Sequence, residues 1–168
     1  KNCKKKKLYL SEDCALSIGA RVNNKYVGGF GDFGCFSFYP AKHITTADGG
    51  MLVCKNKKFY KKIKLLKGFG VDKNFNERKV PGEYDVKLLG LNYRLDEIRS
   101  RLGISQLKKL DYFVSIREKN YLFLKNSFKK IKKFKLLNLD SENNKKSSYY
   151  CVSIILSNKL KKDRLKII

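Results

Sequence analysis

The chain has 168 residues, of which 42% are hydrophobic, so it is long enough and apolar enough to form one domain with a core. Lys and Arg number 39 against 15 Asp and Glu, which gives a formal net charge of +24. No apolar run approaches the roughly 20 residues of a membrane span, and the five cysteines form no CxxC pair of the kind that zinc sites use.

The positive charge alone would suggest a protein that binds nucleic acid or another anionic surface. The lysines are scattered along the chain, however, and their densest runs, residues 4–7 and 129–133, lie near one end and around a helix terminus. We therefore interpret these runs as solvated surface and expect no nucleic-acid, membrane or metal partner. Because the cysteines form no CxxC pair and no run is apolar enough to be a membrane span, we expect reduced, buried thiols in a soluble, cytoplasmic protein.

The first candidate site residue follows the first predicted strand. Residues 1–7 are typical of the end of a helix, and Leu8-Tyr9-Leu10 predicts a short strand that places Glu12 and Asp13 at its carboxyl end. Ligands of open α/β sheets bind at that edge. Asp13 can be interpreted as a turn or helix N-cap residue, or as a carboxylate that holds a proton on the ring nitrogen of a cofactor.

The central part of the chain predicts two strands joined by a loop. Gly34-Cys35-Phe36-Ser37-Phe38 forms the first strand, and Met51-Leu52-Val53-Cys54 forms the second. The loop carries a single lysine, Lys42, among small and apolar neighbours. A lysine that is partly removed from water releases its proton more readily, and it then becomes a usable amine nucleophile. The neighbouring His43, which is the only histidine, is expected to pack rather than to act as an acid or base.

The residues from Phe36 to Gly50, together with Ser11-Glu12-Asp13-Cys14-Ala15, resemble the pyridoxal-phosphate (PLP) sugar aminotransferases of the DegT/StrS type. The resemblance covers residues 8–168, and the Lys42 loop is its most specific part. It implies a fold-type-I, aspartate-aminotransferase-like α/β fold with a mixed sheet flanked by helices. Residues 1–110 would be the C-terminal part of the large PLP-binding domain. Residues 111–168 would be a long linking helix and the start of an α+β small domain.

The same resemblance assigns roles to four residues. Lys42 would bond PLP and then move the proton as general base and acid. Asp13 would keep the pyridine nitrogen protonated, and Ser37 would bind the cofactor phosphate. Asn92 would bind the phosphate of the cofactor held in the partner subunit. Arg94 is a second candidate for that last role, and Asn92 could instead be a simple turn residue.

The remaining elements are predicted from hydrophobic periodicity and from glycine, proline and polar clusters. In chain order they are a helix at residues 57–67 that ends at Gly68-Phe69-Gly70, a polar loop at 71–86, one long helix from about residue 95 to 128, a polar loop at 140–148, a strand at 149–156 and a helix from 159.

The function implied by the resemblance is transfer of an amino group, from a donor such as glutamate, to a keto group of a nucleotide-linked deoxy sugar. The product would serve cell-surface polysaccharide or glycan biosynthesis, and the enzyme would be a homodimer with shared active sites. Family members have further large-domain strands upstream and most of a small domain downstream, so we expect this chain to be a fragment that binds PLP poorly alone.

Two alternatives remain open. A related dehydratase branch has a similar loop with histidine in place of the lysine, so Lys42 favours transamination. A catalytically inactive relative is suggested by Leu16, where family members usually have Gln or His, and by Arg101, where they have a small residue. A product assay with a 4-keto sugar nucleotide separates the two enzymatic hypotheses.

Overall fold

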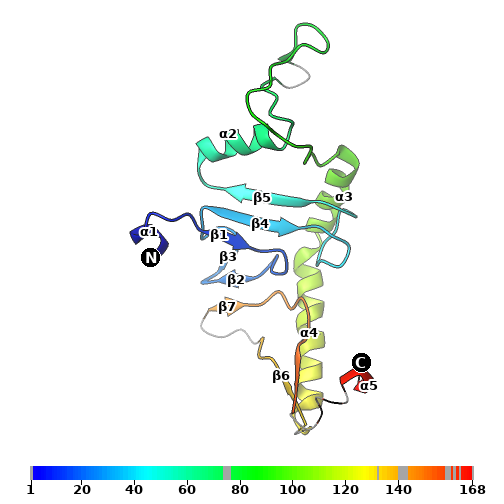
Figure 1. Cartoon of the computed structure of the whole chain (residues 1–168). Helices are drawn as coiled ribbons and strands as arrows, with labels where there is room; N and C mark the ends of the chain where they lie inside the picture. Colours follow the sequence, from blue (N-terminus) through cyan, green and yellow to red (C-terminus); the bar gives the residue numbers. More distant parts are fainter. Residues whose placement is uncertain are drawn as a thin grey trace.

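The structure is a computed structural model that describes residues 2–73, 77–131, 133–139, 144–157, 160, 162 and 164–167. A mixed sheet lies in the middle, α2 lies along one edge of it, and α4 extends away toward the C-terminal strands (Figure 1). The helices are α1 (Asn2–Lys5), α2 (Lys57–Leu66), α3 (Glu97–Leu107), α4 (Leu110–Phe128) and α5 (Arg164–Ile167). The strands are β1 (Ser11–Asp13), β2 (Arg21–Val22), β3 (Lys25–Tyr26), β4 (Phe33–Ser37), β5 (Gly50–Cys54), β6 (Phe134–Leu136), β7 (Lys145–Lys146) and β8 (Ile154–Leu156).

The central sheet has the order β1-β4-β5 and is mixed, as the sequence predicts. β1 runs parallel to β4 with Asp13 opposite Cys35, and β4 runs antiparallel to β5 with Ser37 opposite Gly50. The two predicted strands around the Lys42 loop are therefore confirmed.

The prediction of a strand at Leu8-Tyr9-Leu10 is wrong, because the strand lies three residues later and β1 begins only at Ser11. Leu10 instead closes the turn before β4: its amide donates to Asp32 Oδ2 at 2.8 Å, and its carbonyl accepts from the Asp32 amide at 2.8 Å. The glycines of this turn have no side chain to hold it in place, so Leu10 and Asp32 fix it.

The Glu12 carboxylate also holds the glycine-rich turn. It accepts hydrogen bonds from the amides of Gly28 at 2.8 Å, Phe30 at 2.7 Å and Gly31 at 2.6 Å. Burial alone would raise the pKa of this carboxyl group, but the three amides and the charge of Lys55 more than offset burial and hold the pKa below its ordinary value of 4.5. Glu12 is thus a structural residue that fastens β1 to the approach of β4.

Replacing Glu12 with glutamine is expected to lower the free energy of unfolding by about 1.5–3 kcal/mol at pH 7, since charge-assisted bonds are lost and one amide faces an NH₂ group. The measurement is urea denaturation, with Glu83→Gln, an exposed glutamate, as the control. Because the folded-state pKa of Glu12 is depressed, its stabilisation is present above pH 4.5 and is lost as the pH falls through that pKa. A difference in the free energy of unfolding between the parent and Glu12→Gln that does not decrease in acid would contradict this account.

A second small sheet, β3-β2-β7, joins segments that are far apart in the sequence. Asn23 and Asn24 form a turn, with φ angles of 51° and 60°, and they close a hairpin between β2 and β3. β7 then pairs antiparallel with β2. This sheet combines residues from both sides of residue 110, and the division of the chain into two domains at that point stays a prediction.

The helix predicted at residues 57–67 is confirmed as α2. Asn56 is its N-cap, because its side-chain oxygen accepts from the amides of Lys58 and Phe59. Gly70, with a φ angle of 72°, ends the helix as predicted, and its amide donates to the carbonyl of Leu65 at 2.8 Å.

The single long helix expected from residue 95 to 128 is divided into α3 and α4 at Lys108–Lys109. The amide of Lys109 bonds to the carbonyl of Gln106 at 3.0 Å, which tightens the last turn of α3 and changes the direction of the chain. Leu110 can then be buried together with Val114 and Tyr121 of α4. These residues form the core with Phe38, Ile44 and Tyr149.

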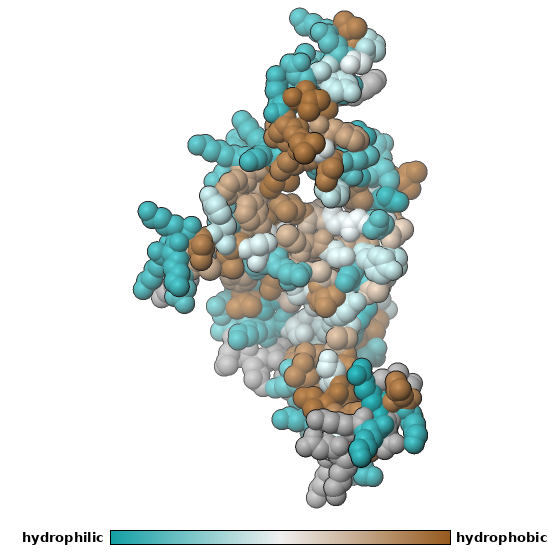
Figure 2. Space-filling view, in the orientation of Figure 1, coloured by the Kyte–Doolittle hydropathy of each residue, from teal (hydrophilic) through white to brown (hydrophobic). Residues whose placement is uncertain are grey.

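Much of the apolar surface is not covered by the described part of the chain. Three apolar side chains of α3 that the helical spacing predicted to pack are exposed in this structure, namely Ile98, Leu102 and Leu107, and Ile104 is exposed as well. Figure 2 shows hydrophobic residues over the central sheet and below the extended loop that follows α2. No helix within the described residues has the length and apolar character needed to cross a membrane.

The cysteine prediction is correct in part. All five cysteines are free thiols, but only Cys14 is buried, while Cys151 is exposed and the others are half-buried. The polar loop at residues 140–148 and the helix from 159 lie partly outside the described residues, and β8 is shorter than the strand predicted at 149–156.

Candidate active site

The Lys42 loop connects β4 to β5 and is closed at its base by backbone hydrogen bonds. The amide of Phe38 donates to the carbonyl of Gly49 at 2.9 Å, and the amide of Thr46 donates to the carbonyl of Phe38 at 3.0 Å. Phe38 and Ile44 bury their side chains in the core. The loop is therefore a fixed part of the fold, and Lys42 lies at its outer turn, where its amide donates to the carbonyl of Tyr39 at 2.9 Å.

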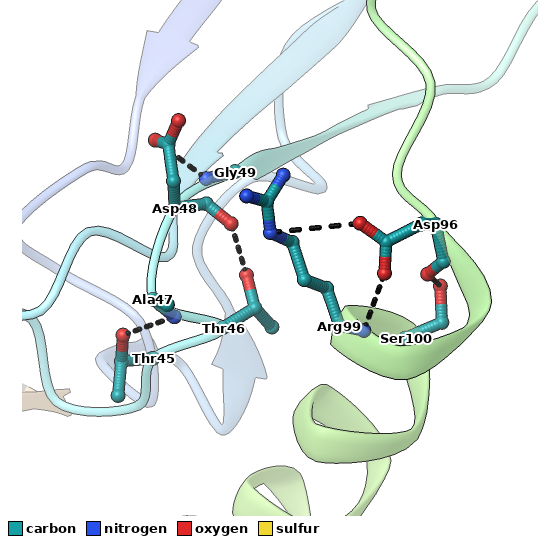
Figure 3. A network of polar contacts seen from close by, with 8 residues as sticks. All are labelled: Thr45, Thr46, Ala47, Asp48, Gly49, Asp96, Arg99 and Ser100. Carbon is teal, nitrogen blue, oxygen red and sulfur yellow. Dashed lines mark hydrogen bonds and ion pairs between the residues drawn. The ribbon is translucent and has the colours of Figure 1, made fainter.

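The returning limb of the loop packs against α3 (Figure 3). Thr46 Oγ1 donates to the carbonyl of Asp48 at 2.6 Å, and Thr45 Oγ1 accepts from the amide of Ala47 at 2.9 Å. A methyl group on Gly103 of α3 would lie only 3.0 Å from Thr46 Cγ2, so a larger residue would push the helix away from the loop. Helix α3 thereby supports the loop that carries Lys42.

The start of α3 is itself fixed by Asp96. Its Oδ1 atom accepts from the amide of Arg99 at 2.8 Å, and its carbonyl accepts from Ser100 Oγ at 2.7 Å. The side chain of Arg99 extends back between Asp96 and the Asp48–Gly49 turn (Figure 3), with its Nε atom 3.6 Å from Asp96 Oδ2. Arg101, the bulky residue in this helix, is exposed.

The side chain of Lys42 is half-buried, and its Nζ atom lies 5.3 Å from the ring centre of Tyr150. It makes no ion pair with a carboxylate among the described residues. The amine is thus neither extended into bulk solvent nor neutralised by an acidic partner, which leaves it available for chemistry.

Asp13 and Ser37 lie on the same face of the central sheet. Asp13 is opposite Cys35 in the parallel pair, and Ser37 follows Cys35 by two residues, so all three side chains point to one side. At about 3.3 Å per residue, Ser37 is roughly 7 Å farther along the strand than Asp13. Asp13 Oδ1 caps the amide of Ala15 at 3.0 Å, and Oδ2 has no hydrogen-bond partner among the described residues.

Asn92 lies apart from the other three candidates. It is exposed and forms a bridge with Gly68 at the end of α2, and its Oδ1 accepts from Arg94 Nε at 3.2 Å. Within the described residues it has no hydrogen bond to Asp13, Ser37 or Lys42. The structure therefore brings Asp13 and Ser37 to one sheet face at the base of the Lys42 loop, and it places Asn92 at the end of α2, with no hydrogen bond to them among the described residues.

His43 points away from the outer turn and is only 4% exposed. Its Nε2–H donates to the carbonyl of Ser148 at 2.8 Å, while Nδ1 is buried and has no hydrogen-bond partner among the described residues. Burial lowers the pKa of His43, and the charges of Arg117 and Lys42 lower it further, although the bond to Ser148 opposes them. The expectation that His43 packs inside the protein is confirmed.

The titration of His43 provides a pH prediction. Its pKa is depressed below 6.5 in the folded chain, so the unfolded chain binds more protons near that pH. The contribution of His43 to stability is therefore highest above pH 6.5 and declines as the pH falls toward the folded-state pKa. His43 is the only histidine, so its NMR signals, followed with and without urea, give its pKa in the unfolded and the folded chain. A folded-state pKa at or above the unfolded-state pKa would refute the burial argument.

Three further residues contact the Lys42 loop from the C-terminal part of the chain, and the sequence analysis did not identify them. Ser148 and Tyr150 contact the loop directly, and Arg117 acts through its hydrogen bond to the carbonyl of Tyr150; all three lie more than 70 residues from Lys42 in the sequence. Nothing local in the sequence indicates these contacts, because they arise only when β7 pairs with β2 and returns the chain to the loop. Leu16, the residue that departs from the family pattern, is 47% exposed, and its carbonyl accepts from Ser148 Oγ.

A cleft with a volume of about 950 Å³ lies elsewhere, between the end of α2 and the segment that follows it. Its walls include several basic side chains, among them Lys64, Lys67 and Arg94. Asp13, Ser37 and Lys42 are not among its lining residues. No group of three His, Cys, Asp or Glu residues that could hold a metal ion occurs in the described part of the chain.

The arrangement around Lys42 has a definite chemical character. The loop carries an amine without a carboxylate partner among the described residues, and the sheet face at its base carries a carboxylate with one oxygen open and a hydroxyl at the end of a strand. An amine can bond a carbonyl compound, a carboxylate can hold a proton on a ring nitrogen, and a hydroxyl can donate to a phosphate. These donors suit a cofactor that carries an aldehyde, a ring nitrogen and a phosphate.

Comparison with known proteins relates the whole chain to one family. A sequence model of the DegT/DnrJ/EryC1/StrS aminotransferase family matches residues 1–168. A curated relative, UDP-4-amino-4,6-dideoxy-N-acetyl-beta-L-altrosamine transaminase of Campylobacter jejuni, is 38% identical over 153 residues, which are 91% of this chain and 39% of the relative. GDP-perosamine synthase of Escherichia coli O157:H7 is 38% identical over 112 residues, which are 67% of this chain and 29% of that enzyme.

Solved structures give the same result. Helicobacter pylori PseC, an aminotransferase involved in the biosynthesis of pseudoaminic acid, superimposes with a TM-score of 0.86 at 35% identity, over 99% of this chain and 43% of its own. A DegT DnrJ EryC1 StrS aminotransferase from Brucella abortus superimposes with a TM-score of 0.81 at 26% identity, over 99% of this chain and 41% of its own. The chain spans about two fifths of the length of these structural relatives, and 39% and 29% of the two curated enzymes.

Proposed function

Because the chain belongs to the DegT/DnrJ/EryC1/StrS aminotransferase family, we propose that the protein is a PLP-dependent aminotransferase that acts on a nucleotide-linked keto sugar. The amino donor is an amino acid such as glutamate, and the amino sugar serves polysaccharide or glycan biosynthesis. The relatives named above act in reactions of this class, as a UDP-linked transaminase and a GDP-perosamine synthase.

The observation that carries the proposal is the state of the Lys42 amine. It is half-buried, it lies at the tip of a loop fixed on both sides, and it has no carboxylate partner among the described residues. A lysine on the surface of so basic a chain would be expected in solvent or in an ion pair. The open Oδ2 atom of Asp13 and the Ser37 hydroxyl, on one face of the sheet, match what PLP requires.

Each residue then has a definite task. PLP, when bound, withdraws electrons from the substrate carbon that loses its proton. Lys42 would hold the cofactor covalently, and its amine, once released, would take up and return the substrate proton as general base and acid. Asp13 would keep a proton on the ring nitrogen, and its Oδ2 atom is open for this role while Oδ1 accepts from the amide of Ala15. Ser37 donates its hydroxyl to the phosphate.

Asn92 has a different role in this proposal, since it is exposed and has no hydrogen bond to Asp13, Ser37 or Lys42 among the described residues. We assign it to the cofactor phosphate of a second subunit, in a homodimer whose active sites combine residues of both chains. The exposed apolar side chains of α3 and β5 are consistent with such a contact. The substrates are small, soluble cytoplasmic metabolites, and we place the reaction in the cytoplasm.

The experiment that tests this function follows nitrogen. The full-length protein is incubated with PLP, glutamate labelled with ¹⁵N and a UDP- or GDP-linked 4-keto-6-deoxy sugar, and the sugar nucleotide is analysed by mass spectrometry. We expect the label in an amino sugar. A sugar that has lost a hydroxyl group and carries no ¹⁵N would identify a dehydratase instead, and an unchanged substrate would support the inactive relative that Leu16 and Arg101 suggested.

A further inference from the structure

The segment Ser147–Tyr150 contacts the Lys42 loop from more than a hundred residues along the chain. His43 Nε2–H donates to the carbonyl of Ser148 at 2.8 Å, and Ser148 Oγ donates to the carbonyl of Leu16 at 3.2 Å. Ser148 is 3% exposed. The segment therefore contacts both the chain that follows Asp13 and the residue next to Lys42.

The other side of this segment is fastened to α4. Arg117 Nη1 donates to the carbonyl of Tyr150 at 3.1 Å, and the Tyr149 hydroxyl donates to Glu118 at 3.0 Å. Tyr149 is 4% exposed and belongs to the core together with Tyr121. The backbone of Tyr150 is thus bonded to α4 through Arg117, while its ring is directed toward the Lys42 loop.

The ring of Tyr150 faces two residues of the loop. Its centre lies 5.3 Å from Lys42 Nζ and 5.5 Å from the ring centre of His43. A cation within about 6 Å of an aromatic face is attracted by the ring quadrupole, and the neutral amine lacks that attraction. Lys42 has no carboxylate partner among the described residues, and its Nζ atom lies over the ring of Tyr150.

We propose that Tyr150 is a positioning residue for Lys42: its ring holds the ammonium group of the lysine whenever that lysine is not bonded to the cofactor. The proposal rests on the proposed function, in which the Lys42 amine takes a proton after its release. The ring then stabilises the protonated amine at a fixed place, and Arg117 fixes the ring through the Tyr150 carbonyl. The step adds one proton to the amine and removes it again, so no other reactant is needed.

The test uses the intact chain without PLP and three variants. Tyr150→Phe keeps the ring, Tyr150→Leu removes it at similar volume, and Tyr60→Leu removes an exposed tyrosine of α2 as a control. Each protein is acetylated with a limiting amount of acetic anhydride at neutral pH, and peptide mass spectrometry gives the rate at Lys42 relative to the other lysines. Loss of about 0.5–1 kcal/mol of cation–π attraction is expected to raise the Lys42 rate about 2- to 5-fold in Tyr150→Leu only.

An equal Lys42 rate in all four proteins would overturn the proposal, and so would an increase in Tyr150→Phe as large as that in Tyr150→Leu. A second measurement needs no variant at position 150. In the unmodified chain, the NMR signals of the Lys42 ε-methylene group, assigned with Lys42→Arg, should lie upfield of those of other lysines because of the ring current, and coincidence with them would equally refute it. Neither readout involves PLP, so failure of the proposed enzyme activity would not affect them.

Discussion

Replacing Lys42 with alanine is expected to reduce amino transfer by the protein on the order of 10³-fold or more, because one side chain supplies both the bond to PLP and the proton transfer. Lys42→Arg should be almost as inactive. Arginine keeps a positive charge near the Tyr150 ring, but its guanidinium is not a usable nucleophile at neutral pH. The loss would therefore be one of chemistry and not of charge.

The measurement is the rate of ¹⁵N transfer to the sugar nucleotide, accompanied by the absorbance of the bound cofactor near the visible edge. Lys119→Ala, which removes an exposed lysine of α4, is the control and should keep both signals. Because the half-buried side chain of Lys42 makes no hydrogen bond or ion pair among the described residues, the thermal midpoint of Lys42→Ala should be close to that of the parent. Retention of the cofactor absorbance in Lys42→Ala would eliminate Lys42 as the bonding residue.

Replacing Tyr121 with alanine is expected to have the largest effect on stability, a loss of about 3–5 kcal/mol in the free energy of unfolding. Tyr121 is only 1% exposed, and its ring centre lies 5.4 Å from that of Tyr149. Its hydroxyl also accepts from the amide of Leu139 at 3.0 Å. The alanine would leave a cavity at the centre of the core and a backbone amide without its acceptor.

Urea denaturation followed by circular dichroism measures this loss. Tyr112→Ala is the matched control, since it removes the same side chain from the same helix at a position that is 63% exposed. The control should lose at most about 0.5 kcal/mol, as is usual for surface substitutions. Equal losses in the two variants would mean that α4 does not pack through Tyr121, and that the core proposed for this chain is wrong.

The parts of the site that the sequence predicts are those determined by short-range pattern. The strands on either side of the Lys42 loop follow from glycines and an alternating apolar run, and both form where expected. Asp13 was placed at the carboxyl end of a strand, which is correct, although that strand begins three residues later than predicted. The local pattern could not show this difference, because Leu10 uses its hydrogen bonds to close a turn with Asp32.

The parts that the sequence did not predict depend on contacts between distant segments. The break between α3 and α4 places Leu110 in a core that Phe38 and Tyr149 complete, and a uniform helical periodicity hides this change of direction. The contact of Tyr150 with Lys42 likewise requires residues 108 positions apart to meet. In α3 the prediction failed in the other direction, since apolar side chains that were predicted to pack are exposed here.

The covalent position of the cofactor tests the central claim most directly. The protein is mixed with PLP, reduced with borohydride, digested and analysed by mass spectrometry for the phosphopyridoxyl group. We predict that this group is found on Lys42, in clear preference to the many other lysines of this basic chain. Labelling that is spread evenly over the lysines, or that is concentrated on a different one, would contradict the account.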